Sequence, residues 1–521
     1  MTEDSARPRL AELCGVLSLA SDVAVGQRLE SGIRSTLLSL GIAEELGLGE
    51  SERSDVYYLN LLRMSGCTAT PEMADSMGDL RALGALFDET ATDFGDRRAA
   101  MPLIFRHLTE GQPLPTKARN VAKAMSVRPS AMKDGHRTHC DVAKVLGARL
   151  QATPAVLDAL DFTYERWDGS GTPDGRAGKD IPLASRIVST GYHAEMLLRA
   201  GGVAGAREEL AARAGRALDP DVVAAFRRRA DDLAAVLDDE SPWSALLDAE
   251  PGAPRCIGVD ELDIATLALA DFAEPLGWMR GHGRRVGELA AAAAGSVRLG
   301  ADDVATTRRA GHVHDVGNIA VSIVTLGKAG PLGELERDDV RLHAYHTEKI
   351  VGRSTALREV GRVAGLHHER VDGSGYHRQV GGTAVPMTAR LVAAADVFDA
   401  LVTERPYRAA LPADEAANLL EQLAERGGLD ATAVSAVLGA AGHRAVVRPT
   451  TWPLGLTDRE VDVLRTVARG FSIKQAAREL SVSPKTVDAH LQKIYPKLGV
   501  STRAAATLRA VEHGLLDAPS R

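Results

Sequence analysis

Residues 367–392 read HHERVDGSGYHRQVGGTAVPMTARLV, and residues 167–188 read WDGSGTPDGRAGKDIPLASRIV. The two stretches share a DGSG turn, and Asp168 aligns with Asp372 at an offset of 204 residues that holds to the end of both. Self-similarity over such a length indicates an internal repeat. We therefore expect two copies of one domain in this chain.

Upstream of these stretches the repeat continues at a different offset. Gly66 aligns with Gly317 at an offset of 251, so the two offsets differ by 47 residues. This difference predicts an insertion in the first copy, between about Pro71 and Gly135.

The chain has 521 residues, enough for about three to four domains, and 45% of them are hydrophobic. Its periodic stretches have helical spacing, and runs of alternating β-branched residues are missing, so we expect an all-α fold. Proline and glycine gather at 241–254 and 448–453, which is typical of domain boundaries. They divide the chain into residues 1–250, 255–447 and 454–521.

The location of the protein is predicted from what the sequence lacks. No apolar run approaches the ~18 residues that cross a bilayer, and the acidic start is not followed by a signal-type segment. Four scattered cysteines without a C-x-x-C pair are typical of free, buried thiols in a reducing compartment. We expect a cytoplasmic protein that has no membrane partner.

Histidines are concentrated in the second copy, where eight of the 15 lie between His282 and His377. Imidazole and carboxylate suit a hard or borderline divalent cation. Two cations ~3.5–4 Å apart can activate a water molecule and orient a phosphate. Asp315, beside His314, is the candidate for a carboxylate shared by both cations. The alternative is that these side chains are hydrogen-bonded polar groups at helix ends.

Residues 275–445 resemble an HD-GYP domain, a branch of the HD phosphohydrolase superfamily. The matching motifs are His282, His314–Gly317, His343, His367–Arg370, Asp372–Tyr376, Arg390, Ala395–Asp396 and Arg405–Arg408.

The resemblance implies an all-α fold that binds two divalent metal ions, iron, manganese or a similar metal. It implies that one ion is held by His282, His314, Asp315 and Asp396. The other would be held by His343, His367 and His368, with Asp315 shared as the central catalytic carboxylate. Arg405 and Arg408 occupy positions where the family binds substrate phosphate, a task suited to guanidinium geometry. The usual family substrate is a cyclic dinucleotide, typically cyclic di-GMP.

Three positions depart from the family pattern. Asn318 stands where the H-D-x-G-K motif has a lysine, and His377 stands where the G-Y-P motif has proline. Trp278 stands four residues before His282, in place of a glutamate, which argues against a third metal. The metal ligands are thus complete, whereas the substrate motifs are altered.

The first copy lacks the metal ligands. His282 aligns with Ser31, His314 with Arg63, and Asp396 with Tyr192. Of the histidines only His343 has a histidine partner, at position 139. We interpret residues 1–250 as a degenerate HD-like domain that serves packing, dimerisation or ligand sensing.

The C-terminal segment is basic, with 11 Lys and Arg against 7 Asp and Glu from Leu454 onward. Capping boxes at Thr457 and Ser472 predict two helices, and Ser483 with Pro484 predicts a third. The third has an apolar stripe at Val487, Leu491, Ile494 and Leu498. The short connection around 480–483 has helix-turn-helix spacing.

Residues 456–516 resemble a LuxR-type DNA-binding domain. The resemblance implies four helices, with 484–495 as the recognition helix. Pro496 is unusual at its position, and we expect it to end this helix early. Candidate phosphate contacts are Lys485, Thr486, Lys493 and Lys497, and candidate base contacts are Asp488, Ala489 and Gln492.

Together these features predict a bacterial transcriptional regulator that couples a metal-dependent phosphohydrolase to DNA binding. Its substrate would be a phosphate ester or a cyclic dinucleotide. The alternative is a non-catalytic sensor, in which a nucleotide or metal bound to the HD domain shifts the DNA-binding state. We expect a homodimer, because LuxR-type modules often bind DNA in pairs.

Overall fold

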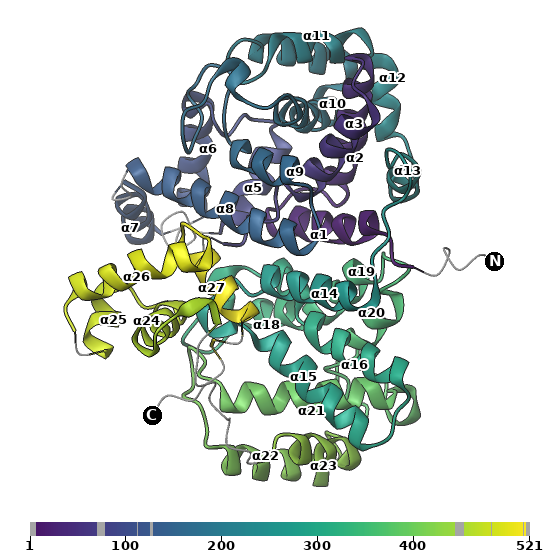
Figure 1. Ribbon diagram of the computed structural model, residues 1–521, viewed down its shortest axis with the longest axis vertical. Coiled ribbons are helices and arrows are strands. Elements are labelled where there is room, and N and C mark those ends of the chain that lie inside the picture. The colour runs from purple at the N-terminus through teal and green to yellow at the C-terminus, as the bar shows by residue number, and fades with distance from the viewer. Residues whose placement is uncertain are drawn as a thin grey trace. The chain divides into compact units, whose positions relative to one another are not determined.

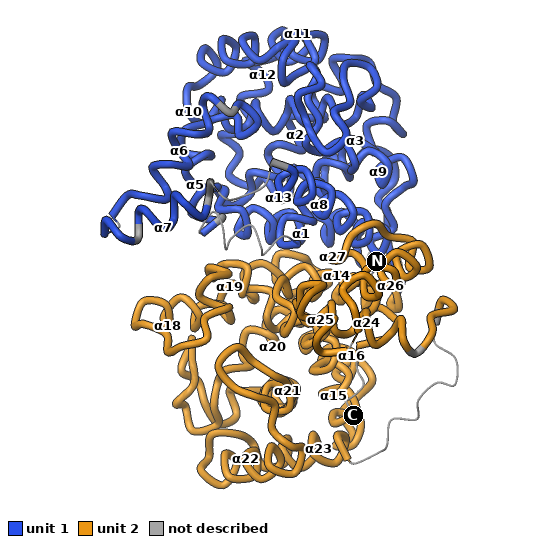
Figure 2. The backbone as a smooth tube through the Cα atoms, turned by 90° about the vertical axis from the view of Figure 1, so that its left-hand side faces the viewer, with its two compact units in different colours: residues 1–258 blue, residues 259–521 orange. Residues whose placement is uncertain are grey.

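The structure is a computed structural model that describes residues 7–69, 79–111, 113–125, 129–442, 453–480, 482–513 and 515–516. Helices and turns make up these residues, without a strand among them, so the prediction of an all-α fold is confirmed (Figure 1). They fall into two compact units, residues 1–258 and 259–521 (Figure 2). The three-part division stays a prediction, and its second seam lies almost wholly outside the described residues.

The first unit is built around long apolar helices that bury Tyr57, Tyr58 and Phe226. Gly202 interrupts α10 with φ 62° and ψ −169°, a conformation that is essentially confined to glycine. The helices of this unit are α1 (Leu10–Ala24), α2 (Ser31–Glu45), α3 (Glu50–Leu62), α5 (Leu80–Glu89), α6 (Arg97–Thr109), α7 (Leu114–Met125), α8 (Pro129–Arg149), α9 (Pro154–Ala159), α10 (Leu183–Arg213), α11 (Pro220–Arg228), α12 (Ala230–Ala234) and α13 (Pro242–Asp248).

The second unit repeats this helix order without the insertion and then adds four C-terminal helices. Its helices are α14 (Val259–Ala273), α15 (His282–Ser296), α16 (Ala301–Val313), α17 (Ile323–Leu326), α18 (Glu334–Arg341), α19 (His343–Val351), α20 (Arg358–Ala364), α21 (Met387–Val402), α22 (Ala413–Glu425), α23 (Ala431–Ala440), α24 (Asp458–Ala468), α25 (Ile473–Glu479), α26 (Pro484–Leu498) and α27 (Arg503–Glu512). Two 3₁₀ turns, η5 (Gly277–Met279) and η6 (Val316–Ala320), flank the helices that carry the histidines.

Equivalent contacts in both units support the predicted repeat. A Cβ atom on Gly66 would lie 2.0 Å from the carbonyl oxygen of His139, and one on Gly317 would lie 1.9 Å from that of His343. The same close approach of a turn to a helix backbone therefore demands glycine at both aligned positions. The described part of the predicted insertion folds as α5, α6 and α7.

The shared DGSG turn has the same hydrogen bonds in each copy. Asp168 Oδ1 accepts from the backbone N–H of Ser170, and Asp372 Oδ1 accepts from that of Ser374. These Asx-type bonds mimic a backbone turn. The motif thus persists in the first copy for a structural reason.

The C-terminal helices follow their predicted caps. Thr457 and Ser472 each form a capping box, and the side chain of Ser483 caps α26. The prediction that Pro496 ends the recognition helix early is wrong, because α26 continues to Leu498. Proline removes only one N–H donor, and the burial of Ile494 and Leu498 in the domain core stabilises the last turn.

Two expectations concern cysteines and membranes. All four cysteines are unpaired, but Cys256 is exposed and Cys67 half-buried, so the expected burial is wrong for these two. Within the described ranges, no helix combines the length and the apolar character needed to span a bilayer.

Candidate metal centre

The seven predicted metal ligands converge at one place in the second unit. They come from the start of α15, the end of α16, the start of α19, the turn after α20 and the middle of α21. Three sets of them have ligand atoms within 4.8 Å of one another: His343, His367 and His368; His282, His314 and Asp315; and His314, His367 and Asp396. Residues as far apart in the chain as His282 and Asp396 thus share one cluster.

Asp315 lies between two groups of imidazoles. Its Oδ1 is 3.3 Å from Nε2 of His343 and 3.9 Å from Nε2 of His367. Its Oδ2 is 3.8 Å from Nε2 of His282 and 3.7 Å from Nε2 of His314. One carboxylate therefore faces a different histidine pair with each oxygen.

Asp396 supplies a second carboxylate to the same cluster. Its Oδ1 lies 3.2 Å from Nε2 of His282 and 3.7 Å from Nε2 of His314. His367 lies near both groups, because its Nε2 is also 3.1 Å from Nε2 of His343. The division of ligands between two ions, as implied by the family resemblance, stays a prediction.

Three histidines are oriented by the same kind of local hydrogen bond. Nδ1–H of His314 donates to the carbonyl of Gly311, three residues earlier, at 2.8 Å. His367 repeats this bond to Ala364 at 2.7 Å, and His343 repeats it to its own third preceding residue. A carbonyl can only accept, so each Nδ1 carries the proton and each Nε2 presents a lone pair to the cluster.

His282 is oriented by an acid that we did not predict. Its Nδ1 is bonded to Oδ2 of Asp399 at 2.6 Å, and Asp399 also pairs with Arg285 at 2.7 Å. Asp399 follows Asp396 by three residues, so both lie on one face of α21. This spacing was the signal that could have revealed it.

A second overlooked acid fixes the start of α15. Glu274 is 2% exposed, and its carboxylate accepts the backbone N–H groups of Gly281 and Gly283 at 2.6 and 2.7 Å. Because these residues flank His282, Glu274 holds the backbone that presents this imidazole. Sequence spacing gives no sign of this role.

The buried donor atoms of the cluster are suited to binding cations. Nε2 of His282 and Nε2 of His314 are buried without a hydrogen-bond partner in the described structure. Buried polar atoms usually have partners, and an orphan needs an explanation. Imidazole lone pairs and ionised carboxylates around one space fit divalent metal ions.

The electrostatics of the cluster agree with ionised acids and, at His367 and His368, with neutral imidazoles. Burial raises the pKa of Asp315, but the imidazoles of His314 and His343 outweigh it and hold this pKa well below its usual value. Burial lowers the pKa of His368 to about 3 and also lowers that of His367. Both imidazoles are therefore neutral at neutral pH, the form that binds metals.

His282 and His314 face the carboxylates, and their pKa values are raised instead of lowered. Burial alone would lower the pKa of His282, but Asp396 and Asp399 raise it to about 10. Burial opposes a similar rise for His314, which Asp315 and Asp396 cause. A cation at this position would take the place of a proton between these imidazoles and the carboxylates.

The third module presents a helix surface in which the predicted contacts are exposed. Lys485, Asp488 and Gln492 are all exposed on α26. Lys493 and Ala489 are exposed as well, and Thr486 is half-buried beside the cap residue Ser483. Lys497 differs from the rest, because its ammonium group binds Oε2 of Glu460 at 2.7 Å.

Comparisons with known proteins match the part of the chain that holds the metal cluster and the C-terminal part to two different families. Residues 272–433 match the model of the HD domain family, and residues 454–510 match that of bacterial regulatory proteins of the luxR family. The chain carries an HD domain and a LuxR-family domain. The predicted resemblance of one module to an HD domain and of the other to a LuxR-type domain is therefore confirmed.

Individual relatives extend these matches. The chain is 29% identical over 426 residues to the 3'3'-cGAMP-specific phosphodiesterase 3 of Vibrio cholerae serotype O1, covering 79% of this chain and 90% of that relative. The crystal structure of a cyclic GMP-AMP-specific phosphodiesterase of V. cholerae matches 84% of this chain and 98% of its own, with a TM-score of 0.58 and 24% identity. At this identity the structural match supports the fold alone.

The C-terminal module has relatives of its own. The chain is 46% identical over 92 residues to the probable transcriptional regulatory protein NarL of Mycobacterium tuberculosis, a match that covers 17% of this chain and 41% of that relative. The LuxR-family assignment of α24 to α27 thus rests on a family model and on a named relative.

The two arginines predicted to bind phosphate in the HD domain have different surroundings. The guanidinium of Arg405 lies 4.6 Å above the ring of Trp278, and its Nε is buried without a partner in the described residues. Arg408 instead donates to the carbonyls of Leu401 and Ala409 at 2.9 and 3.0 Å, and also to that of Ala400. A direct contact of Arg408 with phosphate would therefore break bonds that hold the end of α21.

The degenerate copy has filled the space that the HD domain uses for its cluster. Arg63, aligned with His314, stacks its guanidinium on the ring of Tyr192, aligned with Asp396, at 4.2 Å. His139 bonds to the Arg63 carbonyl at 2.7 Å and to the Tyr164 hydroxyl at 3.1 Å. Within its described residues, the first unit has no group of ligands that could hold a metal ion.

Proposed function

We propose that the HD domain hydrolyses a cyclic dinucleotide in a metal-dependent reaction and that the LuxR-family domain makes the chain a transcriptional regulator. The observation that carries the proposal is the position of Asp315, whose two oxygens face two separate histidine pairs. The named activity of the V. cholerae relative, a 3'3'-cGAMP-specific phosphodiesterase, supports this class of substrate.

We infer that the cluster holds two divalent cations, iron, manganese or a similar metal. Two such ions supply an activated water molecule and offset the negative charge of a phosphodiester. The two buried, orphaned Nε2 atoms of His282 and His314 fit this role. Asp315 would be shared by both ions, and Asp396 would complete the side that faces His282.

The remaining side chains position the substrate. Arg405, held against Trp278, would donate to a phosphate oxygen with its free N–H groups. Tyr376 stacks on His368 with ring centroids 4.6 Å apart and presents an aromatic surface at the rim of the cluster. Arg408 would support the Arg405 turn, because its guanidinium is bonded to backbone carbonyls.

In the DNA-binding module, α26 would enter the major groove. Exposed Lys485 and Lys493 would contact phosphates, while Asp488, Ala489 and Gln492 would face base edges. A homodimer would place two such helices on adjacent half-sites about one helical turn apart. This arrangement would also double the modest positive charge of one module.

The test is turnover by the full chain expressed with manganese or iron. We expect hydrolysis of 3'3'-cGAMP or cyclic di-GMP that Asp315→Asn abolishes. His346→Gln is the matched control, because His346 lies on α19, three residues after His343, and outside the ligand groups. Equal turnover by Asp315→Asn and the unaltered chain would reject the assignment, as would full metal content with no hydrolysis of either nucleotide.

A nucleotide sensor without catalysis is the second candidate. Asn318 replaces the family's lysine and is 6% exposed, and Arg408 is committed to backbone carbonyls. Both features reduce the positive charge available to a substrate phosphate. The sensor predicts saturable binding of a cyclic dinucleotide without hydrolysis, together with a change in DNA affinity when it binds.

A further inference from the structure

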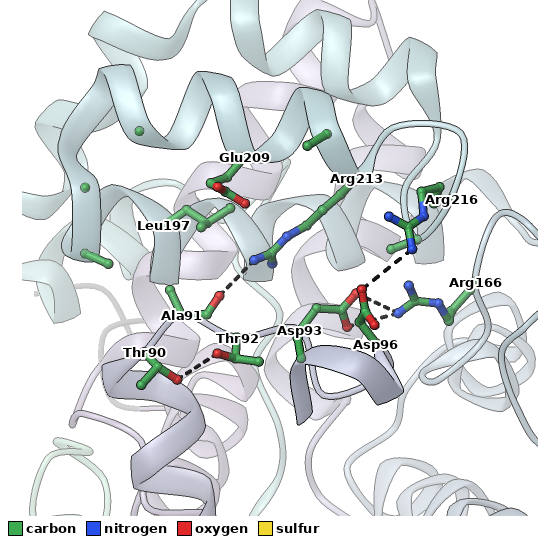
Figure 3. A pocket seen from close by; sticks show the side chains of 16 residues that line it. Thr90, Ala91, Thr92, Asp93, Asp96, Arg166, Leu197, Glu209, Arg213 and Arg216 are labelled. Carbon is green, nitrogen blue, oxygen red and sulfur yellow. Dashed lines mark hydrogen bonds and ion pairs between the residues drawn. The ribbon is translucent and has the colours of Figure 1, made fainter. Parts of the chain in front are cut away.

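The first unit contains a cavity of about 430 Å³, whose lining does not include Arg63, His139 or Tyr192 (Figure 3). The C-terminal half of α10 forms one side, from Leu197 to Arg213. Residues 90–99 form another side, and Arg166 joins the lining beside Asp93. Its volume is at the low end of the range of about 300–1,000 Å³ that is typical of small-molecule sites.

Two features that distinguish the first copy from the second build this cavity. Residues 90–99 belong to the insertion that the second copy lacks. The other wall lies on both sides of the Gly202 break in α10, which has 31 residues, whereas its counterpart α21 has 16. The copy that lost its metal ligands has thus gained a hollow at a different position.

The charges around the cavity are only partly paired. Arg166 binds both carboxylate oxygens of Asp93, at 2.9 and 2.8 Å. Arg216 lies 3.6 Å from Asp96, a longer pair on the open side. Arg213 lies to one side of these pairs, against the Ala91 carbonyl, and has no carboxylate within ion-pair distance among the described residues (Figure 3).

Arg213 is held in place by neutral acceptors. It donates to the carbonyl of Ala91 at 2.8 Å and approaches Nδ1 of His193 at 3.2 Å. Burial lowers the pKa of His193 to about 3, so this imidazole is neutral and accepts the bond. Burial also lowers the pKa of Arg213 itself, because desolvation of the cation outweighs the carboxylates of Asp93, Glu209 and Asp96, which raise it.

The α10 side of the cavity also carries an apolar stretch between Leu197 and Glu209. It is formed by small residues of α10, among them Ala200, Gly201 and Gly205. A Cβ atom on Gly201 or Gly205 would meet no other atom within 4 Å. Such a surface can pack against the face of a planar ring, while the neighbouring arginine side chains bind an anion.

We propose that this cavity binds a nucleoside monophosphate. The phosphate would pair with Arg213 and Arg216, since guanidinium groups bind phosphate oxygens in a planar, bidentate geometry. The base would lie along the glycine and alanine wall of α10. Glu209, on the rim, would accept hydrogen bonds from the ribose hydroxyls. This site would give the degenerate copy a ligand-sensing role of its own, in addition to the function of the HD domain.

The experiment separates this site from the metal centre. Full-length Asp315→Asn protein, treated with a chelator, is titrated by calorimetry with GMP, AMP, guanosine and inorganic phosphate. We expect saturable binding of GMP or AMP that is tighter than that of guanosine or phosphate. Absence of nucleotide binding would overturn the proposal, and phosphate binding as tight as GMP would overturn the nucleotide assignment. Neither result depends on whether the HD domain is active.

Two variants locate the site. Gly205→Leu would fill the hollow without a clash and should weaken binding at least tenfold, whereas Ala204→Leu, on the adjacent exposed position, should leave it unchanged. Arg213→Gln should also weaken binding at least tenfold, because it removes the charged donor. Unchanged affinity in Gly205→Leu would reject the cavity as the site, even if Arg213→Gln failed to fold.

Discussion

The Oδ2 atom of Asp399 lies 2.6 Å from Nδ1 of His282 and fixes the direction in which this imidazole points. Oδ1 of the same carboxylate is 2.7 Å from Nε of Arg285. This acid is 5% exposed and is therefore well shielded from solvent. With its Nδ1 engaged, His282 presents Nε2 to Asp315 and Asp396.

Asp399→Asn should lower metal affinity about 10–100-fold, the usual effect of losing a partner that orients a ligating histidine. Asparagine keeps the size of the side chain but removes the charge that supports the imidazole. Competition with a chromogenic chelator measures the change. Asp302→Asn is the control, because Asp302 is exposed in the first turn of α16. Equal affinity in the Asp399 variant would mean that His282 does not depend on this contact.

Gly317→Ala should lower the free energy of unfolding by about 1–3 kcal/mol, because the added methyl group overpacks a helix contact. Its Cβ atom would lie 1.9 Å from the carbonyl of His343 and would displace the helix that carries this ligand. We therefore also expect reduced metal content. Urea denaturation and elemental analysis measure the two effects.

The control for Gly317→Ala has the opposite expected sign. Gly295 lies inside α15, and a Cβ atom there would meet nothing within 4 Å. Gly295→Ala should therefore stabilise the chain by about 0.5–1 kcal/mol, since glycine inside a helix is unfavourable. Destabilisation by both variants would show that space around the backbone does not explain the Gly317 result.

The helical fold could be predicted because its signals are local. Capping boxes at Thr457 and Ser472 and the stripe on α26 depend on residues three or four positions apart, and the structure has all of them. Pro496 was misjudged because the outcome depends on tertiary packing. The burial of Ile494 and Leu498 outweighs the loss of one backbone donor.

The metal centre could be predicted in part. A cluster of histidines with carboxylates is unusual in a sequence, so His282, His314 and Asp315 could be predicted as metal ligands. Glu274 could not be predicted, because its role comes from hydrogen bonds formed only after folding, whereas Asp399 was detectable by its three-residue spacing from Asp396. The cavity beside Arg213 was also missed, because a helix break and an insertion create it jointly and neither has a chemical signature of its own.

The first unit should lose stability as the pH falls below about 6.5. Burial lowers the pKa of His139 to about 3, although its bond to the Arg63 carbonyl opposes this shift. The unfolded chain takes up a proton below the ordinary value of 6.5, whereas the folded chain does so only near 3. The stabilisation is thus complete above pH 6.5 and is lost progressively toward pH 3.

His139→Gln should flatten this dependence by up to about 1.4 kcal/mol per pH unit, the contribution of one proton. Glutamine retains a donor for the Arg63 carbonyl. Chemical denaturation of both proteins between pH 4 and pH 7 measures the slopes. His136 and His193 also have lowered pKa values and will leave a residual slope in the variant. Parallel curves would exclude His139 as a titrating group.

Alanine at Lys485 and Lys493 should weaken DNA binding and reduce the slope of log affinity against log salt by about 1 for each lysine. Both side chains are exposed on α26, and within the described part of the chain neither forms an ion pair that would compete with a phosphate. Binding of the full chain to its operator, measured from low to high salt, gives the slope. Equal slopes in the variants and the unaltered chain would reject the placement of α26 against the DNA backbone.

Lys497 provides a matched comparison on the same helix. Its ammonium group binds Glu460 at 2.7 Å and the Gly455 carbonyl at 2.9 Å, so it is already neutralised within the module. Lys497→Ala should therefore lower the thermal stability of the module and change the salt slope less than Lys485→Ala does. If the slope fell by the same amount, Lys497 must leave Glu460 when DNA binds, and its predicted phosphate contact would stand.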